Sequence, residues 1–418
     1  MPASARRTVL LLFLLGLSAR VAWGLATGLS GAPVEDERGY ALLARSLADG
    51  RGLELTLPSE FADVPPRTSF RAPLVPVLLA PLAALGLGDA AFRVAAIFAG
   101  AAAAPLAWLA LRRTRLGAFA VWPAAALAVW PASIHLSTRI LSEPFAGALL
   151  LGALAVPAAD GGARAGILRG AASGALAGLA VLARPATLPA ALAVALFRGG
   201  WRFAAAHVAL VLLVLVPWVA LNASEHGRPL LTTNTGATLL GGNCEASLAA
   251  AHPGKWVEPR AAWGDAPDPP DLGIWGWSRL TEEESDRRFT GRALAFAADR
   301  PADAARLVAW KAVRFLDPDP TSVKEDAAAK RLAGWASFLP VLLLAVPGAW
   351  IARSPGSGLG PWAMLLAGTF ATALVFYADT RLRNPADPAF LAFAGVAFHA
   401  FLARRAPSAA ADGGNDRT

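Results

Sequence analysis

The sequence predicts an all-α polytopic membrane protein with about ten transmembrane helices. Of its 418 residues, 56% are hydrophobic and only 16% are charged, and the mean hydropathy is +0.47. A soluble domain of ordinary composition carries about 25% charged residues. Long apolar runs recur along the chain, and a helix of about 20 such residues crosses a bilayer with its backbone hydrogen bonds satisfied internally.

The positive charges orient these helices. The predicted spans cover about 8–28, 91–111, 117–136, 143–159, 166–183, 186–197, 203–222, 332–352, 361–378 and 386–403, of which 186–197 is short for a perpendicular span. With these spans, the basic clusters all fall on one side, which is cytoplasmic by the positive-inside rule: Arg6/Arg7, Arg112/Arg113/Arg115, Arg164, Arg198/Arg202, Arg353 and Arg404/Arg405. The net charge of +8 therefore reflects orientation and indicates no nucleic-acid partner.

The apolar stretch 72–87 is the exception among the apolar runs. It is short for a span and contains Pro73, Pro76 and Pro81. If it crossed the membrane, every basic cluster from Arg112 onward would lie outside. We therefore expect an interfacial helix on the outer side, packed under the helix predicted for 36–48.

This topology divides the chain into four parts. They are an N-terminal transmembrane core (1–222) with a first exterior loop (30–90), a small exterior insert (223–331), C-terminal transmembrane helices (332–405) and a polar tail (406–418) that we expect to be disordered. In the first loop, Tyr40, Leu43 and Leu47 share one face of a helix that Gly50 and Gly52 end. In the insert, a capping box at 281–284 opens a helix, and Pro301 opens another.

The candidate chemistry begins with the acidic run Glu35-Asp36-Glu37 beside the first span. Carboxylates are costly in lipid, so this cluster lies in water, where it either complements the helix dipole or performs chemistry. Arg20, inside the first span, either extends to the interface or contacts a lipid phosphate. A single cysteine (Cys244) and five scattered histidines exclude a disulfide within the chain and indicate no metal site.

Several short motifs together resemble the GT-C glycosyltransferases, the family-39-like membrane enzymes related to protein O-mannosyltransferases and the aminoarabinose–lipid A transferase. They run in order along nearly the whole chain: Asp36-Glu37 with Tyr40 and Ala44, Arg71-Ala-Pro73-Leu-Val-Pro76, Leu141-Ser-Glu-Pro144, Pro217-Trp218 with Asn222 and Gly227, Asn234-Thr-Gly236, Gly242-Asn243, Lys311 with Arg314-Phe315, and Arg381-Leu-Arg-Asn-Pro385 with Pro388. The order of these motifs agrees with the predicted topology.

The resemblance implies an enzyme of the bacterial cytoplasmic membrane whose active site faces outward. It would transfer a sugar from a polyisoprenyl-phosphate donor to an extracytoplasmic acceptor in the cell envelope, with inversion and without a metal or other cofactor. The first-loop aspartate of the family maps to Asp36, the general base, with Glu37 as its partner or as a helix cap. Further site candidates are Tyr40, Glu143 as a donor ligand or a helix cap, and the cations that would hold the donor phosphate: Arg381, Arg383, Lys311, Arg71 and Arg20.

Two other classes compete with this interpretation. A transporter or flippase of lipid-linked sugars predicts paired ionisable residues inside the membrane and internal repeats, and the sequence has few of the former and no clear repeat. A scaffold for envelope assembly would keep the fold and tolerate loss of Asp36.

Overall fold

The computed structural model describes residues 1–34, 36–56, 66–157, 162–263, 280–319, 328–354 and 356–405. Within these ranges the fold is helical, and the one β-type pairing is an isolated bridge between Leu55 and Arg67. The predicted tail, 406–418, lies outside the described residues, as do residues 264–279 of the insert.

Six helical segments of the described chain are long and apolar enough to cross a membrane. They are α1 (Ala3–Thr27), α4 with α5 (Asp89–Ala101 and Ala103–Leu111), α9 (Gly162–Ala183), α11 (Gly200–His226), α17 (Ala328–Ala352) and the run of α19 (Thr380–Arg383), η5 (Asn384–Ala386) and α20 (Asp387–Arg405). The fold class predicted from the sequence, a polytopic helical membrane protein, is confirmed.

The count of about ten spans is not confirmed. The segment predicted as 117–136 is a bent pair, in which η2 (Gly117–Ala120) and α6 (Val121–Ala128) meet α7 (Pro131–Ser137) at 54°. Three other predicted spans are shorter helices: α8 (Glu143–Ala155), α10 (Leu188–Ala193, after η3, Pro185–Thr187) and α18 (Gly360–Val375). Hydropathy locates apolar runs, but a proline such as Pro131, inside the run 117–136, interrupts the helix within it.

Arg20 stabilises the bend between α6 and α7 from inside the bundle. Its buried guanidinium donates to Ala128 O (2.9 Å), at the end of α6, and to Ser133 Oγ (2.9 Å) and Ser137 Oγ (2.8 Å) on α7. It also donates to Gly16 O of its own helix (3.0 Å). A bend leaves backbone carbonyls without partners inside the helix, and Arg20 supplies one of the missing donors.

Three glycines at four-residue spacing bring α9 against α11. A Cβ at Gly170 would lie 2.4 Å from Phe203 O, and a Cβ at Gly174 would lie 2.2 Å from His207 O. Gly178 faces Val214 in the same way. Small residues at this spacing allow the two backbones to approach closely, which is how helices associate where lipid provides no hydrophobic drive.

The first exterior loop contains α2 (Asp36–Ala48) and α3 (Leu74–Ala84). The predicted helix 36–48 is confirmed with the same bounds, and Gly50 and Gly52 follow it with positive φ values of 76° and 83°. Tyr40, Ala41 and Ala44 of α2 pack on Val75 and Leu79 of α3. The expected packing of the proline-containing segment against the Asp36 helix is therefore present.

The insert contains α12 (Thr235–Gly242), α13 (Glu245–Ala249), α14 (Pro259–Trp263), α15 (Glu282–Asp299) and α16 (Pro301–Phe315). The predicted start of this helix is confirmed, because the Thr281 hydroxyl caps α15 by accepting a hydrogen bond from Glu284 N (3.2 Å), which is one of the two hydrogen bonds of a capping box. The helix predicted to begin at Pro301 is α16. Gly236 of α12 packs against the α15 backbone near Asp286, so the insert helices form one unit.

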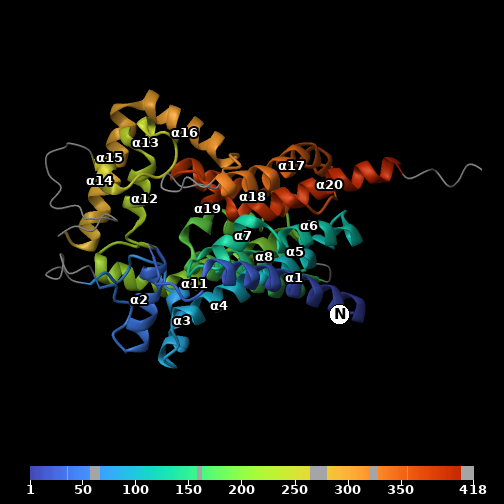
Figure 1. Ribbon diagram of the computed structural model, residues 1–418, viewed down its shortest axis with the longest axis horizontal. Helices are drawn as coiled ribbons and strands as arrows, with labels where there is room; N and C mark the ends of the chain where they lie inside the picture. The colour runs from blue at the N-terminus through green and yellow to red at the C-terminus, as the bar shows by residue number, and fades with distance from the viewer. Residues whose placement is uncertain are drawn as a thin grey trace, which may run out of the picture.

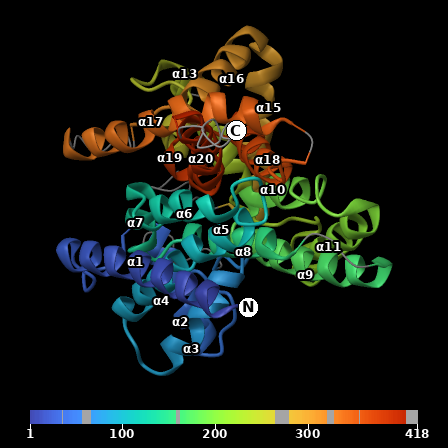
Figure 2. The same cartoon turned by 90° about the vertical axis from the view of Figure 1, so that its right-hand side faces the viewer.

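The insert and the basic clusters lie at opposite ends of the bundle. In Figure 1, α12–α16 and α2 are at one end, while the start of α1 and the end of α20 are at the other. Figure 2 shows α17, α18 and α20 as one group of helices, separated from α1, α4 and α9 by α5, α6 and α8. At the end remote from the insert, Arg113 and Arg198 both donate to carbonyls at the end of α8, and Arg115 N donates to Ser357 O (3.0 Å).

Candidate functional site

Asp36 lies at the centre of a half-buried ion-pair network. It begins α2 and pairs with Arg71, just before α3, and with Arg381 of α19, whose Nη1 lies 2.6 Å from the carboxylate. Burial alone would raise the pKa of Asp36, but the two arginines more than offset it and hold this pKa well below its usual range. The carboxylate is therefore ionised throughout the physiological pH range.

Glu143 extends the network on the other side of Arg381. The Arg381 Nε donates to Glu143 Oε1, and Arg184 Nη1 lies 2.9 Å from the same oxygen. Glu143 starts α8 and is 1% exposed, and Arg184 follows α9 directly. Three arginines thus surround two carboxylates, which leaves one net positive charge at the site. Arg71 Nε and Arg184 Nε are buried and make no hydrogen bond among the described residues.

This network opens into a cavity of about 1640 Å³. Asp36, Arg71, Arg184 and Arg381 line it, and Tyr40 contributes to the same wall, with the Arg71 guanidinium 5.6 Å from its ring centroid. Apolar side chains line the cavity where α7 lies between α1 and α17, including Trp23, Ile134 and Phe338. The insert contributes polar groups of the 232–238 and 255–258 segments, among them Asn234, Thr235, Thr238, Lys255 and Glu258.

Glu37 points away from the cavity that Asp36 lines. It is 2% exposed and accepts hydrogen bonds from Ile140 N (2.9 Å) and Arg93 Nε (3.2 Å), with Arg139 Nε at 3.6 Å. Its neighbour Val34 also donates to it from the backbone (3.4 Å), as in a helix cap. Of the two roles that the sequence leaves open for Glu37, this geometry supports capping and packing.

Three of the five predicted phosphate-binding cations make their hydrogen bonds and ion pairs away from Asp36. Arg20 stabilises the α6–α7 bend and lies outside the cavity lining. Lys311 is fully buried and donates to Asn243 Oδ1 (2.7 Å) and to the Leu374 and Val375 carbonyls at the end of α18. Arg383 lines the cavity, but it pairs with Asp387 (3.1 Å) and donates to Asp317 O (2.7 Å).

Among these five cations, only Arg71 and Arg381 form ion pairs with Asp36. The sequence analysis did not identify Arg184 and Arg139, which also line the cavity. Arg139 lies between the site and Glu37, and Arg184 holds Glu143. The signal for Arg184 was its position at the end of an apolar run next to a proline, where a charged side chain faces the membrane boundary. Both arginines stand near the exterior ends of predicted spans, and the sequence analysis assigned neither of them a role.

Among the residues that the structure describes, no group of three His, Cys, Asp or Glu side chains could hold a metal ion. Asp36 and Glu143 are instead paired with arginines. The arrangement can bind an anion through Arg71, Arg184 and Arg381, and it places an ionised carboxylate beside that anion.

Comparison with known proteins identifies the fold. An oligosaccharyltransferase AglB from Archaeoglobus fulgidus, in complex with an inhibitory peptide and a dolichol-phosphate, aligns over 100% of this chain and 53% of its own, with a TM-score of 0.54 and 13% identity. The same enzyme tethered to an acceptor peptide aligns over 97% of this chain and 50% of its own, with a TM-score of 0.55 and 12% identity. The chain has the GT-C fold.

The chain spans about half the length of these oligosaccharyltransferase structures. ArnT from Cupriavidus metallidurans bound to undecaprenyl phosphate aligns over 94% of this chain and 79% of its own, with 17% identity and a TM-score of 0.41. Because this TM-score is below 0.5, the fold assignment depends on the oligosaccharyltransferase alone. No protein-family model and no curated protein sequence matches the chain.

Proposed function

We propose that the protein is a membrane glycosyltransferase that transfers a sugar from a polyisoprenyl-phosphate carrier to an acceptor on the outer side of a bacterial cytoplasmic membrane. The observation that carries the proposal is the Arg71–Asp36–Arg381 arrangement in a large cavity between the helical bundle and the insert. The shared fold supports it, because the AglB structure contains a dolichol-phosphate.

The three cavity arginines suit the phosphate of such a donor. Guanidinium groups bind phosphate oxygens through paired N–H groups, and Arg71 and Arg184 each have an unused N–H. The leaving phosphate gains charge in the transition state, so fixed cations stabilise it more than the ground state. In this proposal the arginines supply that stabilisation, and no divalent metal is assigned.

Asp36 is the proposed general base. Two arginines hold the pKa of the Asp36 carboxylate far below its usual value, so it is a weak base as long as both guanidinium groups pair with it alone. A donor phosphate that binds Arg71 and Arg381 would draw both guanidinium groups from Asp36 and raise its pKa. The base would thus become competent when the donor is in place, and it would take the acceptor's proton as the acceptor oxygen attacks the anomeric carbon and the phosphate leaves with inversion.

The cavity walls suggest where the two substrates lie. The apolar lining near Trp23 and Ile134, where α7 meets α1 and α17, suits a polyisoprenyl chain. The polar lining near Asn234 and Thr238, from the insert, suits the sugar and the acceptor. Lipids of the surrounding membrane and an extracytoplasmic acceptor, either a glycan, a lipid or a protein, are therefore the proposed partners.

Binding and turnover by the purified protein test the proposal. We expect undecaprenyl phosphate to bind the wild type, Arg381→Gln to weaken this binding by about tenfold or more, and sugar release from undecaprenyl-phosphate sugars to fall in parallel. Arg306→Gln, on the exposed surface of α16, is the matched control and should change neither. Failure of every lipid phosphate to bind the folded wild type would reject the enzyme and favour the scaffold.

A further inference from the structure

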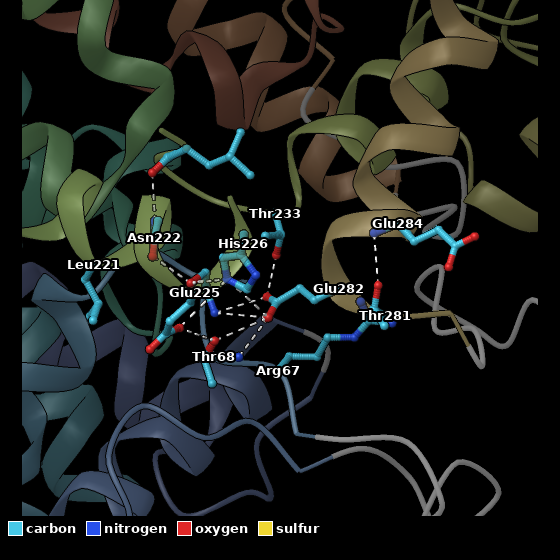
Figure 3. Close-up of polar contacts among 12 residues, drawn as sticks. Arg67, Thr68, Leu221, Asn222, Glu225, His226, Thr233, Thr281, Glu282 and Glu284 are labelled. Atoms are coloured by element: carbon cyan, nitrogen blue, oxygen red, sulfur yellow. Dashed lines mark hydrogen bonds and ion pairs between the residues drawn. The ribbon is translucent and has the colours of Figure 1, made fainter. Parts of the chain in front are cut away.

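The carboxylate of Glu282 links α15 of the insert to the first exterior loop. It is the first residue of α15 and is 9% exposed, and it faces the backbone of residues 68–69 (Figure 3). Its oxygens accept hydrogen bonds from Thr68 N (2.9 Å) and Ser69 N (3.0 Å), and Thr233 donates its hydroxyl to the same carboxylate. Thr68 and Ser69 lie more than 210 residues from Glu282 along the chain, and Thr233 lies 49 residues from it.

Ser69 is also held by α11 and by the backbone of Thr233. Ser69 Oγ donates to Asn222 Oδ1 (2.7 Å) and lies 2.9 Å from His226 Nε2, and Thr233 N donates to Ser69 O (3.0 Å). Ser69 is fully buried. Its backbone N–H, its carbonyl and its hydroxyl are therefore all engaged, so this point of the loop is fixed in space.

Arg71 is only two residues further along the chain. Two residues span at most about 7 Å, so a fixed Ser69 sharply limits where the Arg71 backbone can be. The Arg71 guanidinium also packs against Phe70, with its Cζ 5.1 Å from the ring centroid, before it reaches Asp36. The Glu282 carboxylate and the Asp36 carboxylate are thus connected through one short stretch of backbone.

We propose that Glu282 is a positioning residue that fixes Arg71 against Asp36 and so couples the insert to the active site. This inference rests on the proposed function for its effect on turnover, but not for its effect on the loop. Without Glu282, the Thr68 and Ser69 amides lose a buried acceptor, the loop loosens, and Arg71 no longer holds Asp36 in one geometry.

A purely local role for Glu282 would give different results. A carboxylate in the first turn of a helix complements the helix dipole, and Glu283 and Glu284 stand in the same turn of α15. Glu284, however, pairs with Arg288 (2.7 Å) at a side-chain exposure of 30%, and none of its hydrogen bonds or ion pairs in the described part of the chain reaches the first loop. Glu284→Gln therefore removes a first-turn charge without touching the loop, and it is the matched control for Glu282→Gln.

The direct test is amide hydrogen exchange in detergent or nanodiscs. In Glu282→Gln we expect the Thr68 and Ser69 amides to exchange about tenfold faster or more than in the wild type, while Glu284→Gln leaves them unchanged. Glu282→Asp, which keeps the charge on a shorter side chain, should give an intermediate rate. Protection of the α9 and α11 amides shows in each variant that the bundle remains folded. Unchanged exchange at residues 68–69 in a folded Glu282→Gln would overturn the proposal.

The pH dependence of turnover tests the connection to Asp36. The charged and titratable groups that face Asp36 are Arg71, Arg381, Tyr40 and Tyr377, and Glu143 lies beyond Arg381. The corresponding groups around Glu282 are Arg67, Glu225, His226 and Asp286. If Arg71 is displaced, the pKa of Asp36 rises, so the acid limb of the kcat/KM profile moves to higher pH. We expect this shift together with a fall in kcat/KM of about 10- to 100-fold in Glu282→Gln.

The two readouts separate the two failures. Faster loop exchange in Glu282→Gln with no turnover even in the wild type would reject the proposed function and leave the loop restraint intact. Faster loop exchange with wild-type kcat/KM and an unmoved acid limb would show that Glu282 fixes the loop without positioning the active site, which overturns the inference.

Discussion

Replacing Glu37 with alanine separates a packing role from a catalytic one at the residue next to the proposed base. The carboxylate is 2% exposed and Arg93 is 5% exposed, so the change leaves a buried guanidinium without its counter-charge. Removing one partner of a buried ion pair costs about 3–5 kcal/mol. Arg93 keeps its bonds to Leu29 O and Gly31 O (both 2.7 Å), so we expect a loss near the lower end, about 3 kcal/mol.

Unfolding by sodium dodecyl sulfate in mixed micelles measures this loss, with Glu54→Ala in the same exterior loop as the control. Glu37→Gln keeps an acceptor for Ile140 N, so it should lose less than Glu37→Ala. In both variants we expect kcat per folded molecule to stay within about threefold of the wild type, because Glu37 does not line the cavity. A variant of wild-type stability, or a stable variant without turnover, would refute this reasoning.

Three further changes test the fold. Arg20→Gln removes donors from the α6–α7 bend, so the unfolding midpoint should fall while donor-lipid affinity in the folded fraction is unchanged; weaker affinity would return Arg20 to the phosphate site. Gly174→Ala places a Cβ 2.2 Å from His207 O and should destabilise by about 1–3 kcal/mol, whereas Gly147→Ala, with open space around it, should be nearly neutral in the same unfolding assay. Burial lowers the pKa of Lys311 to about 8. From about pH 8 to 10.5 the unfolded chain therefore binds more protons than the folded chain, so the wild type should gain stability relative to Lys311→Met as the pH rises. A stability difference that stays flat across that range would contradict the burial of Lys311.

Local sequence patterns predicted those parts of the fold that local physics determines. The helix 36–48 begins at an acidic first turn and is followed by two glycines with positive φ, and α15 begins at its capping box. Six of the predicted apolar runs are long helices in the structure. The arginine clusters on one side predicted that the insert lies at the other end of the bundle, as Figure 1 shows. Each of these features depends on residues close together in the chain.

The partners of the charged residues could not be predicted in this way. Arg20 binds the α6–α7 bend, Lys311 binds the end of α18, and Arg184 holds Glu143 across 41 positions of the chain. A single sequence shows that these residues are charged and near an apolar run, but their partners depend on how the helices pack. For the same reason, Asp36 and Glu37 are adjacent in the sequence but face different surroundings, since successive residues of a helix point about 100° apart.

The central claim is that Asp36 accepts a proton while the arginines hold the donor phosphate. Asp36→Asn keeps nearly the same shape and removes the charge, so single-turnover transfer and undecaprenyl-phosphate binding should be measured on the same purified variant. We expect the transfer rate to fall by about 10²–10⁴-fold while the lipid phosphate binds at least as tightly as to the wild type, because Arg71 and Arg381 lose a competing carboxylate. Transfer at the wild-type rate by folded Asp36→Asn would contradict the account.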